Sequence, residues 1–259
     1  MHLISKYINY IRKAQGRHQI HSPFVYNFVD SCLKIKISKE FKTKIKLLTN
    51  SLSNNHTKLM ISDFGAGSKK MGQIRTVSSI YKNASCKGTY AHLLYKLCNY
   101  YQPKSILELG TNLGVGTFFL HEGNPNAKII TIDGCLETQN IARQNLTNDN
   151  ICFIHAKFEE YITNLTPQKF DLIYIDGDHR GEALLNYLEM LQAFSHDETI
   201  FVIDDIRWSK DMFDSWKQLI ASNNFHLTLD IFKMGILIKK QAKEKEHFII
   251  RIKNVLTSL

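Results

Sequence analysis

Ile106-Leu-Glu-Leu-Gly110-Thr-Asn-Leu-Gly114-Val-Gly-Thr117 is the stretch that decides the fold of this 259-residue chain. It opens with aliphatic residues typical of a short buried strand, with Glu108 among them. A glycine turn follows, and then the start of a helix. Glycine has no side chain to block a ligand and adopts dihedrals forbidden to other residues, while a helix start presents free backbone N–H groups. The stretch therefore predicts a strand, a turn that binds a polar small molecule, and a helix.

The spacing of the glycines argues against a dinucleotide site, which usually carries G-x-G-x-x-G. Gly110 and Gly114 are four residues apart, and the groups on Thr111 and Asn112 between them suit a carboxylate. The pattern E-x-G-T-x-x-G-x-x-T resembles the first motif of class I S-adenosylmethionine-dependent methyltransferases, and most closely that of small-molecule O-methyltransferases related to the catechol type. The resemblance implies that this motif holds the methyl donor through Glu108, Gly110, Thr111, Asn112, Gly114 and Thr117.

A second aliphatic strand, residues 128–133, ends in Asp133. The acid follows the glycines by about the twenty residues expected for a ribose-binding carboxylate in α/β units. A carboxylate can accept hydrogen bonds from both ribose hydroxyls of the donor. Asp133 could instead cap the helix expected over residues 137–146. The glycine turn upstream favours the ribose role.

A third strand, residues 151–155, leads into Ala156, Lys157 and Phe158. The resemblance places this turn beside the adenine ring, and the match is one of position rather than of distinctive residues. Phe158 fits a place in the hydrophobic core equally well.

Acidic residues end the next two expected strands. Asp176 closes residues 170–176, while Asp204 and Asp205 close residues 199–205. If these two strands are neighbours, they lie ~4.8 Å apart, and their carboxylates converge and repel one another unless a cation or protons neutralise them. Oxygen ligands without cysteine favour a hard divalent ion. We therefore expect a magnesium ion, with manganese or calcium as substitutes, held by Asp176, Asp204 and Asp205.

The resemblance implies the same metal ligands, and it also places Asp176 beside the donor. In metal-dependent O-methyltransferases a lysine three residues beyond the first aspartate serves as general base, but this chain has His179 there. Histidine can do this work because its unperturbed pKa of ~6.5 lies near operating pH. The run Asp-Gly-Asp-His is similar to natural-product O-methyltransferases that use histidine. Asp178 is the alternative base.

Composition excludes several classes of protein. Apolar residues make up 44% of the chain, as in ordinary globular proteins. No apolar run approaches the ~18–20 residues that span a membrane, and the first residues lack the features of a signal peptide. The five cysteines are scattered without a C-x-x-C pair, which argues against zinc and dithiol sites. We expect a cytoplasmic protein with reduced thiols.

The basic charge lies in the first third of the chain. Residues 1–90 carry 16 Lys or Arg against 3 Asp or Glu, whereas the remainder carries 17 against 21. Such a basic segment attracts nucleic acid, an anionic membrane or an acidic substrate, or it is a solvated lysine face. A second glycine loop, residues 62–68, could be an anion-binding nest, a mobile lid or an ordinary loop.

From residue 104 onward strands and helices alternate, as in a parallel sheet covered on both faces. We predict an α/β protein with the Rossmann-like, seven-stranded methyltransferase sheet, mostly parallel with an antiparallel end strand. The hairpin over residues 225–238 would supply that end strand, and residues 241–246 would form a charged, solvated tail. Two parts are expected: a helical basic extension at 1–87, serving as a lid or dimer contact, and an S-adenosylmethionine-binding domain at 88–259.

The predicted function is divalent-metal-assisted methyl transfer from S-adenosylmethionine to a hydroxyl of a small molecule. An RNA ribose methyltransferase that uses the basic N-terminus is one alternative, although nucleic acid is not the favoured partner. A nicotinamide-dependent oxidoreductase is another, and the glycine spacing and the acids argue against it. A non-catalytic binding module on the same scaffold is a third. The sequence leaves the acceptor unnamed and a homodimer open.

Overall fold

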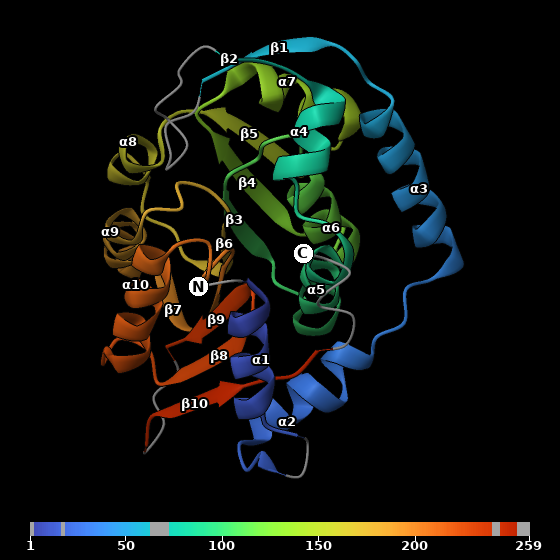
Figure 1. Ribbon diagram of the computed structural model, residues 1–259. Helices are drawn as coiled ribbons and strands as arrows, with labels where there is room; N and C mark the ends of the chain where they lie inside the picture. The colour runs from blue at the N-terminus through green and yellow to red at the C-terminus, as the bar shows by residue number, and fades with distance from the viewer. Residues whose placement is uncertain (1–2, 17–18, 63–72, 240–243, 253–259) are drawn as a thin grey trace.

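The strands of the central sheet carry the site. The computed structural model describes residues 3–16, 19–62, 73–239 and 244–252 (Figure 1). The strands are β3 (Ser105–Leu109), β4 (Lys128–Asp133), β5 (Ile151–His155), β6 (Phe170–Ile175), β7 (Ser195–Ile203), β8 (Leu227–Ile231), β9 (Met234–Ile238) and β10 (Glu246–Ile249). Their order in the sheet is β10-β8-β9-β7-β6-β3-β4-β5. Strand β9 is antiparallel to both neighbours, and the other pairs are parallel.

The predicted fold class is confirmed, with one strand added. Strands β3 to β9 form the expected seven-stranded, mostly parallel sheet, and the hairpin of β8 and β9 supplies the antiparallel strand. The eighth strand, β10, pairs in parallel with β8 at the sheet edge. The prediction of a solvated tail over residues 241–246 is therefore wrong at its last residue, Glu246, where β10 begins. Four residues make a weak periodic signal, and the lysines and glutamates before them masked it.

Helices cover both faces of this sheet (Figure 1). One face carries α5, α6 and α7, and the other carries α8, α9 and α10. Their bounds are α5 (Gly88–Tyr101), α6 (Val115–Gly123), α7 (Leu136–Asn145), α8 (Phe158–Thr163), α9 (Gly181–Leu191) and α10 (Lys210–Ala221), with a short 3-10 turn, η4 (Gln192–Phe194), before β7.

Side chains alternate between two cores because successive residues of a strand point to opposite faces. On β6, Leu172 and Tyr174 pack on the face of α5 and α6, whereas Ile173 and Ile175 pack on the face of α9 and α10. All four are at most 3% exposed. Central parallel strands are buried on both faces, which explains their continuous aliphatic runs.

The N-terminal segment adds helices to the first of these faces. It contains α1 (Leu3–Lys13), α2 (Pro23–Asp30), η2 (Cys32–Lys34), α3 (Lys39–Ser53) and α4 (Val77–Ala84), and a hairpin of β1 (Lys58–Ile61) and β2 (Gln73–Thr76) that the sequence did not predict. Buried residues such as Val25, Phe28 and Phe41 join the core beneath α5 and α6. Most of the second glycine loop lies outside the described residues. No helix among the described residues has the length and apolar character needed to cross a bilayer.

Candidate active site

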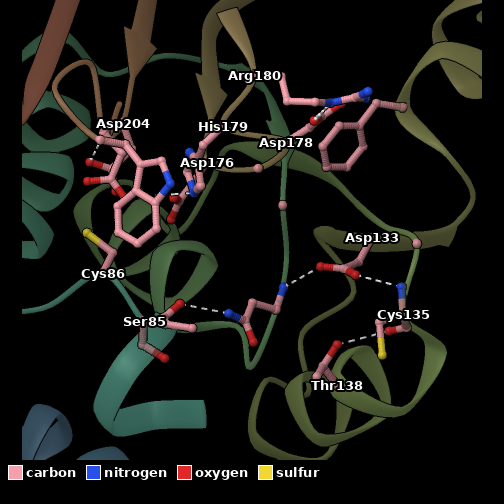
Figure 2. Close-up of a pocket in the computed structure, with 18 of the residues that line it drawn as sticks. Ser85, Cys86, Asp133, Cys135, Thr138, Asp176, Asp178, His179, Arg180 and Asp204 are labelled. Carbon is pink, nitrogen blue, oxygen red and sulfur yellow. Dashed lines mark hydrogen bonds and ion pairs between the residues drawn. The ribbon is translucent and has the colours of Figure 1, made fainter. Parts of the chain in front are cut away.

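One large cavity opens at the carboxyl ends of β3, β4, β6 and β7 (Figure 2). Its volume is about 1380 Å³, larger than the ~300–1,000 Å³ of a pocket for one small ligand. Figure 2 shows Asp133, Cys135 and Thr138 at one end and Asp204, Asp176 and His179 toward the other. Ligands of open α/β sheets bind at this edge, where the strand order reverses. The cavity therefore has room for two ligands placed side by side.

The turn after β3 requires glycine at two positions. Gly110 has φ +114°, and a Cβ there would lie 2.1 Å from the backbone oxygen of Asp176. Gly114 has φ +79° at the N-cap of α6, where a Cβ would lie 2.8 Å from Cβ of Ala142. The first glycine lets the β3 turn press against the β6 turn, and the second lets α6 begin against α7. The predicted strand, turn and helix are confirmed.

Asp133 joins two of the turns that line the cavity. Its Oδ2 accepts a hydrogen bond from the backbone N–H of Asn112, at 2.7 Å, and its Oδ1 accepts one from the N–H of Cys135, also at 2.7 Å (Figure 2). The carboxylate thus fixes the β3 and β4 turns to each other. Each carboxylate oxygen can accept a further hydrogen bond, so the geometry leaves the predicted ribose role open.

Polar atoms beside this end of the cavity have no partner among the described residues. They are Oδ1 of Asn112 and Oγ of Ser85, both buried, and both residues line the cavity. The amide nitrogen of Asn112 donates to the carbonyl of Ala84 at 2.8 Å, which fixes the orientation of that side chain. Buried polar atoms without partners are costly. Together with the Asp133 carboxylate and the bare Gly110 turn, these atoms fit a polar nucleoside ligand such as S-adenosylmethionine.

Other residues of the first motif lie behind the turn. Glu108 is fully buried, and its Oε2 accepts hydrogen bonds from Thr117 Oγ1 at 2.5 Å and Thr131 Oγ1 at 2.6 Å. Burial raises the pKa of Glu108 to about 7, against the lowering effect of the two hydroxyls. The hydroxyl of Thr111 bonds that of Thr131 at 2.7 Å. Of the residues predicted to hold the donor, Glu108, Thr111, Gly114, Thr117 and Ala156 are not part of the cavity wall, so we assign them to shaping the turns.

The turn after β5 contributes side chains to the cavity. Lys157 and Phe158 line it as predicted for the donor site. Phe158 also packs on the second core and contacts Tyr187 with ring centroids 5.7 Å apart, so it serves both of the roles that the sequence left open. Cys135 and Thr138 at the start of α7 line the same end of the cavity, and the sequence analysis missed them. Their place directly after Asp133, at a helix start, was the available signal.

Three carboxylates converge at the other end of the cavity. Ile175 and Ile203 are paired in register, so Asp176 and Asp204 leave β6 and β7 side by side, with Asp205 next along the chain. Tyr174 Oη donates to Asp176 Oδ2 at 2.9 Å. Burial, and then the Asp204 charge, raise the pKa of Asp176 well above its ordinary value, and the same two causes raise the pKa of Asp205. The predicted convergence of the strand ends is therefore present.

The residues do not fit a magnesium site, because a lysine already supplies the cation. Nζ of Lys233 lies 3.0 Å from Asp204 Oδ2 and 3.5 Å from Asp205 Oδ1. Burial works to lower the pKa of Lys233, but the two carboxylates outweigh it and raise that pKa above its ordinary value. Within the described part of the chain, no group of three or more His, Cys, Asp or Glu side chains is placed to hold a metal ion. The predicted magnesium ion finds no support in this arrangement.

The two candidate bases differ in their surroundings. His179 lines the cavity, with Nε2 3.8 Å from Asp205 Oδ2. Asp178 accepts two hydrogen bonds from Arg180, at 2.5 and 2.6 Å, and one from Tyr187 Oη at 2.8 Å. The carboxylate of Asp178 is thus engaged in holding the loop, whereas the imidazole of His179 faces the cavity. This geometry favours His179 over Asp178 as the base.

Sequence reasoning missed two further residues at this end. The indole of Trp208 is 64% exposed, lines the cavity and lies 5.8 Å from the ring of His179, measured between centroids. A tryptophan three residues after an acidic pair was the available signal in the sequence. Lys233 occupies the tip of the closing hairpin, and nothing in the sequence marked that tip as facing the acids of β7.

Comparisons with known proteins agree with this architecture. Residues 107–206 match the family model described as a methyltransferase domain. The O-methyltransferase hkm8 of Aspergillus hancockii is 36% identical over 120 residues, which cover 41% of this chain and 46% of that protein. A catechol O-methyltransferase of Niastella koreensis is 29% identical over 129 residues, which cover 46% of this chain and 56% of that protein. The chain thus spans about half the length of the curated relatives it matches.

A solved structure extends the likeness to most of the chain. The O-methyltransferase TomG from Streptomyces achromogenes, in complex with SAM, superposes with a TM-score of 0.58 at 12% identity, covering 84% of this chain and 96% of that one. At this level of identity the likeness concerns the fold. The fold and the matched domain together confirm the resemblance to class I methyltransferases.

Proposed function

We propose that this chain is an S-adenosylmethionine-dependent O-methyltransferase that acts on a hydroxyl group of a small molecule. The observation that carries the proposal is the single cavity that joins a nucleoside-compatible end, at Gly110, Asn112 and Asp133, to an end with an imidazole, at His179. A pocket of this kind holds a donor and an acceptor next to each other, and such positioning supplies several kcal/mol of rate acceleration. The names of the curated relatives, O-methyltransferases among them, support the same reaction.

Residues at the first end would bind the donor. Asp133 would hold the ribose hydroxyls, Asn112 and Ser85 would meet the polar amino-acid end, and Phe158 would border the adenine. When bound, S-adenosylmethionine supplies a methyl group on a positively charged sulfur, so that breaking its C–S bond as the new C–O bond forms leaves a neutral thioether.

His179 would take the proton from the acceptor hydroxyl. Loss of that proton makes the oxygen a better nucleophile, and a positioned base contributes ~10²–10⁴-fold in rate. The proton ends on the imidazole, and the acceptor leaves as a methyl ether. Trp208 gives this end an aromatic surface against which an acceptor ring could pack. We assign no step to a metal ion, because the Lys233 ammonium already lies against Asp204 and Asp205 and offsets part of their negative charge.

Calorimetry with S-adenosylmethionine and NAD titrated separately tests the proposal. We expect the methyl donor to bind and NAD not to bind, and Asp133→Asn to weaken donor binding at least about tenfold, since it alters two charge-assisted contacts. Release of S-adenosylhomocysteine with a panel of phenols, catechols and aliphatic alcohols then identifies the acceptor class. Binding of NAD in place of the donor, or donor binding without transfer to any hydroxyl, would contradict the proposed reaction.

A further inference from the structure

Hydrogen bonds of its backbone fix the position of Lys233. It lies at the tip of the hairpin between β8 and β9. Its N–H donates to the carbonyl of Ile231 at 2.9 Å and to Tyr90 Oη at 3.2 Å, and its carbonyl accepts from the N–H of Ile206 at 2.9 Å. The hairpin tip is therefore tied to α5 and to the loop after β7. Lys233 therefore has a fixed position in the cavity wall.

The side chain of Lys233 points its charge at the acidic end of the cavity. Nζ contacts Asp204 and Asp205 and lies 5.8 Å from the centroid of the Tyr90 ring. The side chain of Lys233 is 22% exposed, and that of Asp204 is 1% exposed. Lys233 also lines the cavity, together with His179. The ammonium is thus shielded from bulk water and still open to a ligand bound beside the imidazole.

Charge balance distinguishes this arrangement from a metal site. Carboxylates that converge at two strand ends need a cation to remain ionised together. Lys233 supplies one positive charge on the Asp204 and Asp205 side, and a divalent cation placed against the same oxygens would be repelled by it. An ammonium carries three N–H donors, and the two carboxylates engage at most two. The third remains for an oxygen in the cavity.

We propose that Lys233 replaces the divalent cation at this site and donates a hydrogen bond to the acceptor oxygen during methyl transfer. The proposal rests on the proposed function for its chemical step. In that step His179 takes the hydroxyl proton, the acceptor oxygen gains negative charge, and the C–O bond forms as the C–S bond breaks. Lys233 stays protonated throughout and stabilises the oxygen electrostatically. The enzyme then works without a metal.

Metal binding tests the proposal without relying on turnover. Full-length protein is treated with chelator, dialysed and titrated with Mn²⁺, and bound ion is measured by electron paramagnetic resonance. The wild type should bind no Mn²⁺ at this site. Lys233→Ala removes the resident charge, and the freed carboxylates can then move together around an ion, so this variant should bind Mn²⁺, and adding Asp204→Asn should abolish that binding. Wild-type protein that binds Mn²⁺ through Asp204, or a Lys233→Ala protein that binds none, overturns the proposal.

Turnover provides the second readout. Chelator should leave wild-type methyl transfer unchanged. Lys233→Met, which keeps the length of the stem, should lower kcat by ~10²–10³-fold, as the loss of one oxyanion donor does, with donor affinity unchanged by calorimetry. Lys233→Arg keeps the charge and should retain more activity than Lys233→Met while still excluding Mn²⁺. Activity that stops with chelator and returns with Mg²⁺ would overturn the inference.

Lys239→Met is the matched control. Lys239 follows β9 at the other end of the same hairpin, where its Nζ contacts Ser195 Oγ, and its loss should change neither Mn²⁺ binding nor kcat. If the protein binds no methyl donor at all, the proposed function is wrong. The Mn²⁺ titrations would still show whether Lys233 occupies the site in place of a divalent cation.

Discussion

Strained residues mark the site at the scale of single side chains. Five non-glycine residues with positive φ occur in the described part of the chain, and four of them line the cavity: Asn112, Asp178, Asp205 and Phe232. Such conformations cost about 1–3 kcal/mol each and persist where neighbouring contacts fix them. Here the contacts are identifiable: the N–H of Asn112 donates to Asp133, and that of Phe232 donates to Asp230 Oδ1 at 2.9 Å. Strain is therefore concentrated where ligands would bind.

His179 carries the first prediction at this scale. Replacing His179 by Ala should lower kcat by ~10²–10⁴-fold because the proton acceptor is lost, while the affinity for S-adenosylmethionine stays unchanged, since the donor end of the cavity is intact. Steady-state kinetics and calorimetry measure the two effects. His226→Ala, at the opposite edge of the sheet, is the control and should change neither quantity. A defect mainly in donor affinity would contradict the role of His179.

Glu108 carries a second prediction, which concerns pH. Its pKa is raised to about 7 by burial, so the folded state holds a proton that the unfolded state releases at lower pH. The stability linked to this proton is complete below the ordinary glutamate pKa of ~4.3 and is lost as pH rises toward 7. The free energy of unfolding should fall by on the order of 3 kcal/mol over this pH range.

Thermal unfolding between pH 5 and pH 8 checks this expectation. The melting temperature of the wild-type protein should fall from pH 5 to pH 8. Glu108→Gln cannot ionise, so its melting temperature should change less over the same range. The glutamine still offers an acceptor to Thr117 and Thr131. Asp149→Asn, an exposed acid in the loop before β5, serves as the control and should keep the wild-type slope. Equal slopes for Glu108→Gln and the wild type would show that Glu108 is ionised in the folded protein at low pH.

At the scale of elements, the turns after β3 and β6 approach each other closely at Gly110. Gly110→Ala would place a Cβ 2.1 Å from the Asp176 carbonyl at a φ of +114°, so the two turns must separate. We expect a loss of several degrees in melting temperature, since destabilisation of ~1 kcal/mol lowers it by ~2–4 °C in a chain of this size, and weaker donor binding. Differential scanning fluorimetry and calorimetry measure both.

Gly16→Ala is the matched control for that substitution. Gly16 has no atom nearer than 4.0 Å to an added Cβ, and its φ lies outside the left-handed region. Alanine there should leave melting temperature and donor affinity unchanged. If Gly110→Ala behaved in the same way, the close approach of the two turns would not be needed for folding or binding.

Elements with a long or strongly patterned sequence could be predicted, and short ones could not. The central strands appear as aliphatic runs because both of their faces are buried, and Gly110, Asp133, Asp176 and Asp204 mark their carboxyl ends. The hairpin of β1 and β2 has four-residue strands in which Leu59 is the one buried side chain. Strands this short span too few residues for an alternation of buried and exposed positions to stand out in the sequence.

Some residues of the candidate site could likewise be predicted from the sequence, and others could not. Residues adjacent in sequence to a strand end, such as Asp133 and His179, could be placed from the sequence. Lys233 could not, because its position beside Asp204 depends on the pairing of β7 with β9, a contact between segments about thirty residues apart. The sequence therefore indicated that the acids need a cation or protons beside them, but it did not point to Lys233.

At the scale of the whole molecule, Arg207 joins the N-terminal helix to the sheet. Its guanidinium bonds both carboxylate oxygens of Asp230 on β8, at 2.6 and 2.7 Å, and the carbonyl of Phe232. It also lies 5.7 Å from the ring of Tyr10 on α1 and 4.8 Å from that of Phe213 on α10, measured to the centroids. Lys6 on α1 donates to the backbone oxygen of Arg207. We still propose a boundary at residue 87 between the N-terminal extension and the donor-binding domain. Contacts of Arg207 connect the two parts across that boundary.

This ion pair carries the prediction for the whole molecule. The Arg207 and Asp230 side chains are 10% and 4% exposed, so Arg207→Met leaves a buried carboxylate without its partner, which costs ~3–5 kcal/mol. Adding Asp230→Asn removes the stranded charge and should recover part of that loss. Urea unfolding followed by circular dichroism measures both midpoints, and Lys210→Met, which breaks an exposed ion pair with Asp214, should leave the midpoint unchanged. If Arg207→Met were as stable as Lys210→Met, the guanidinium would not be what holds α1 against the hairpin, and the N-terminal segment would depend on its apolar contacts alone.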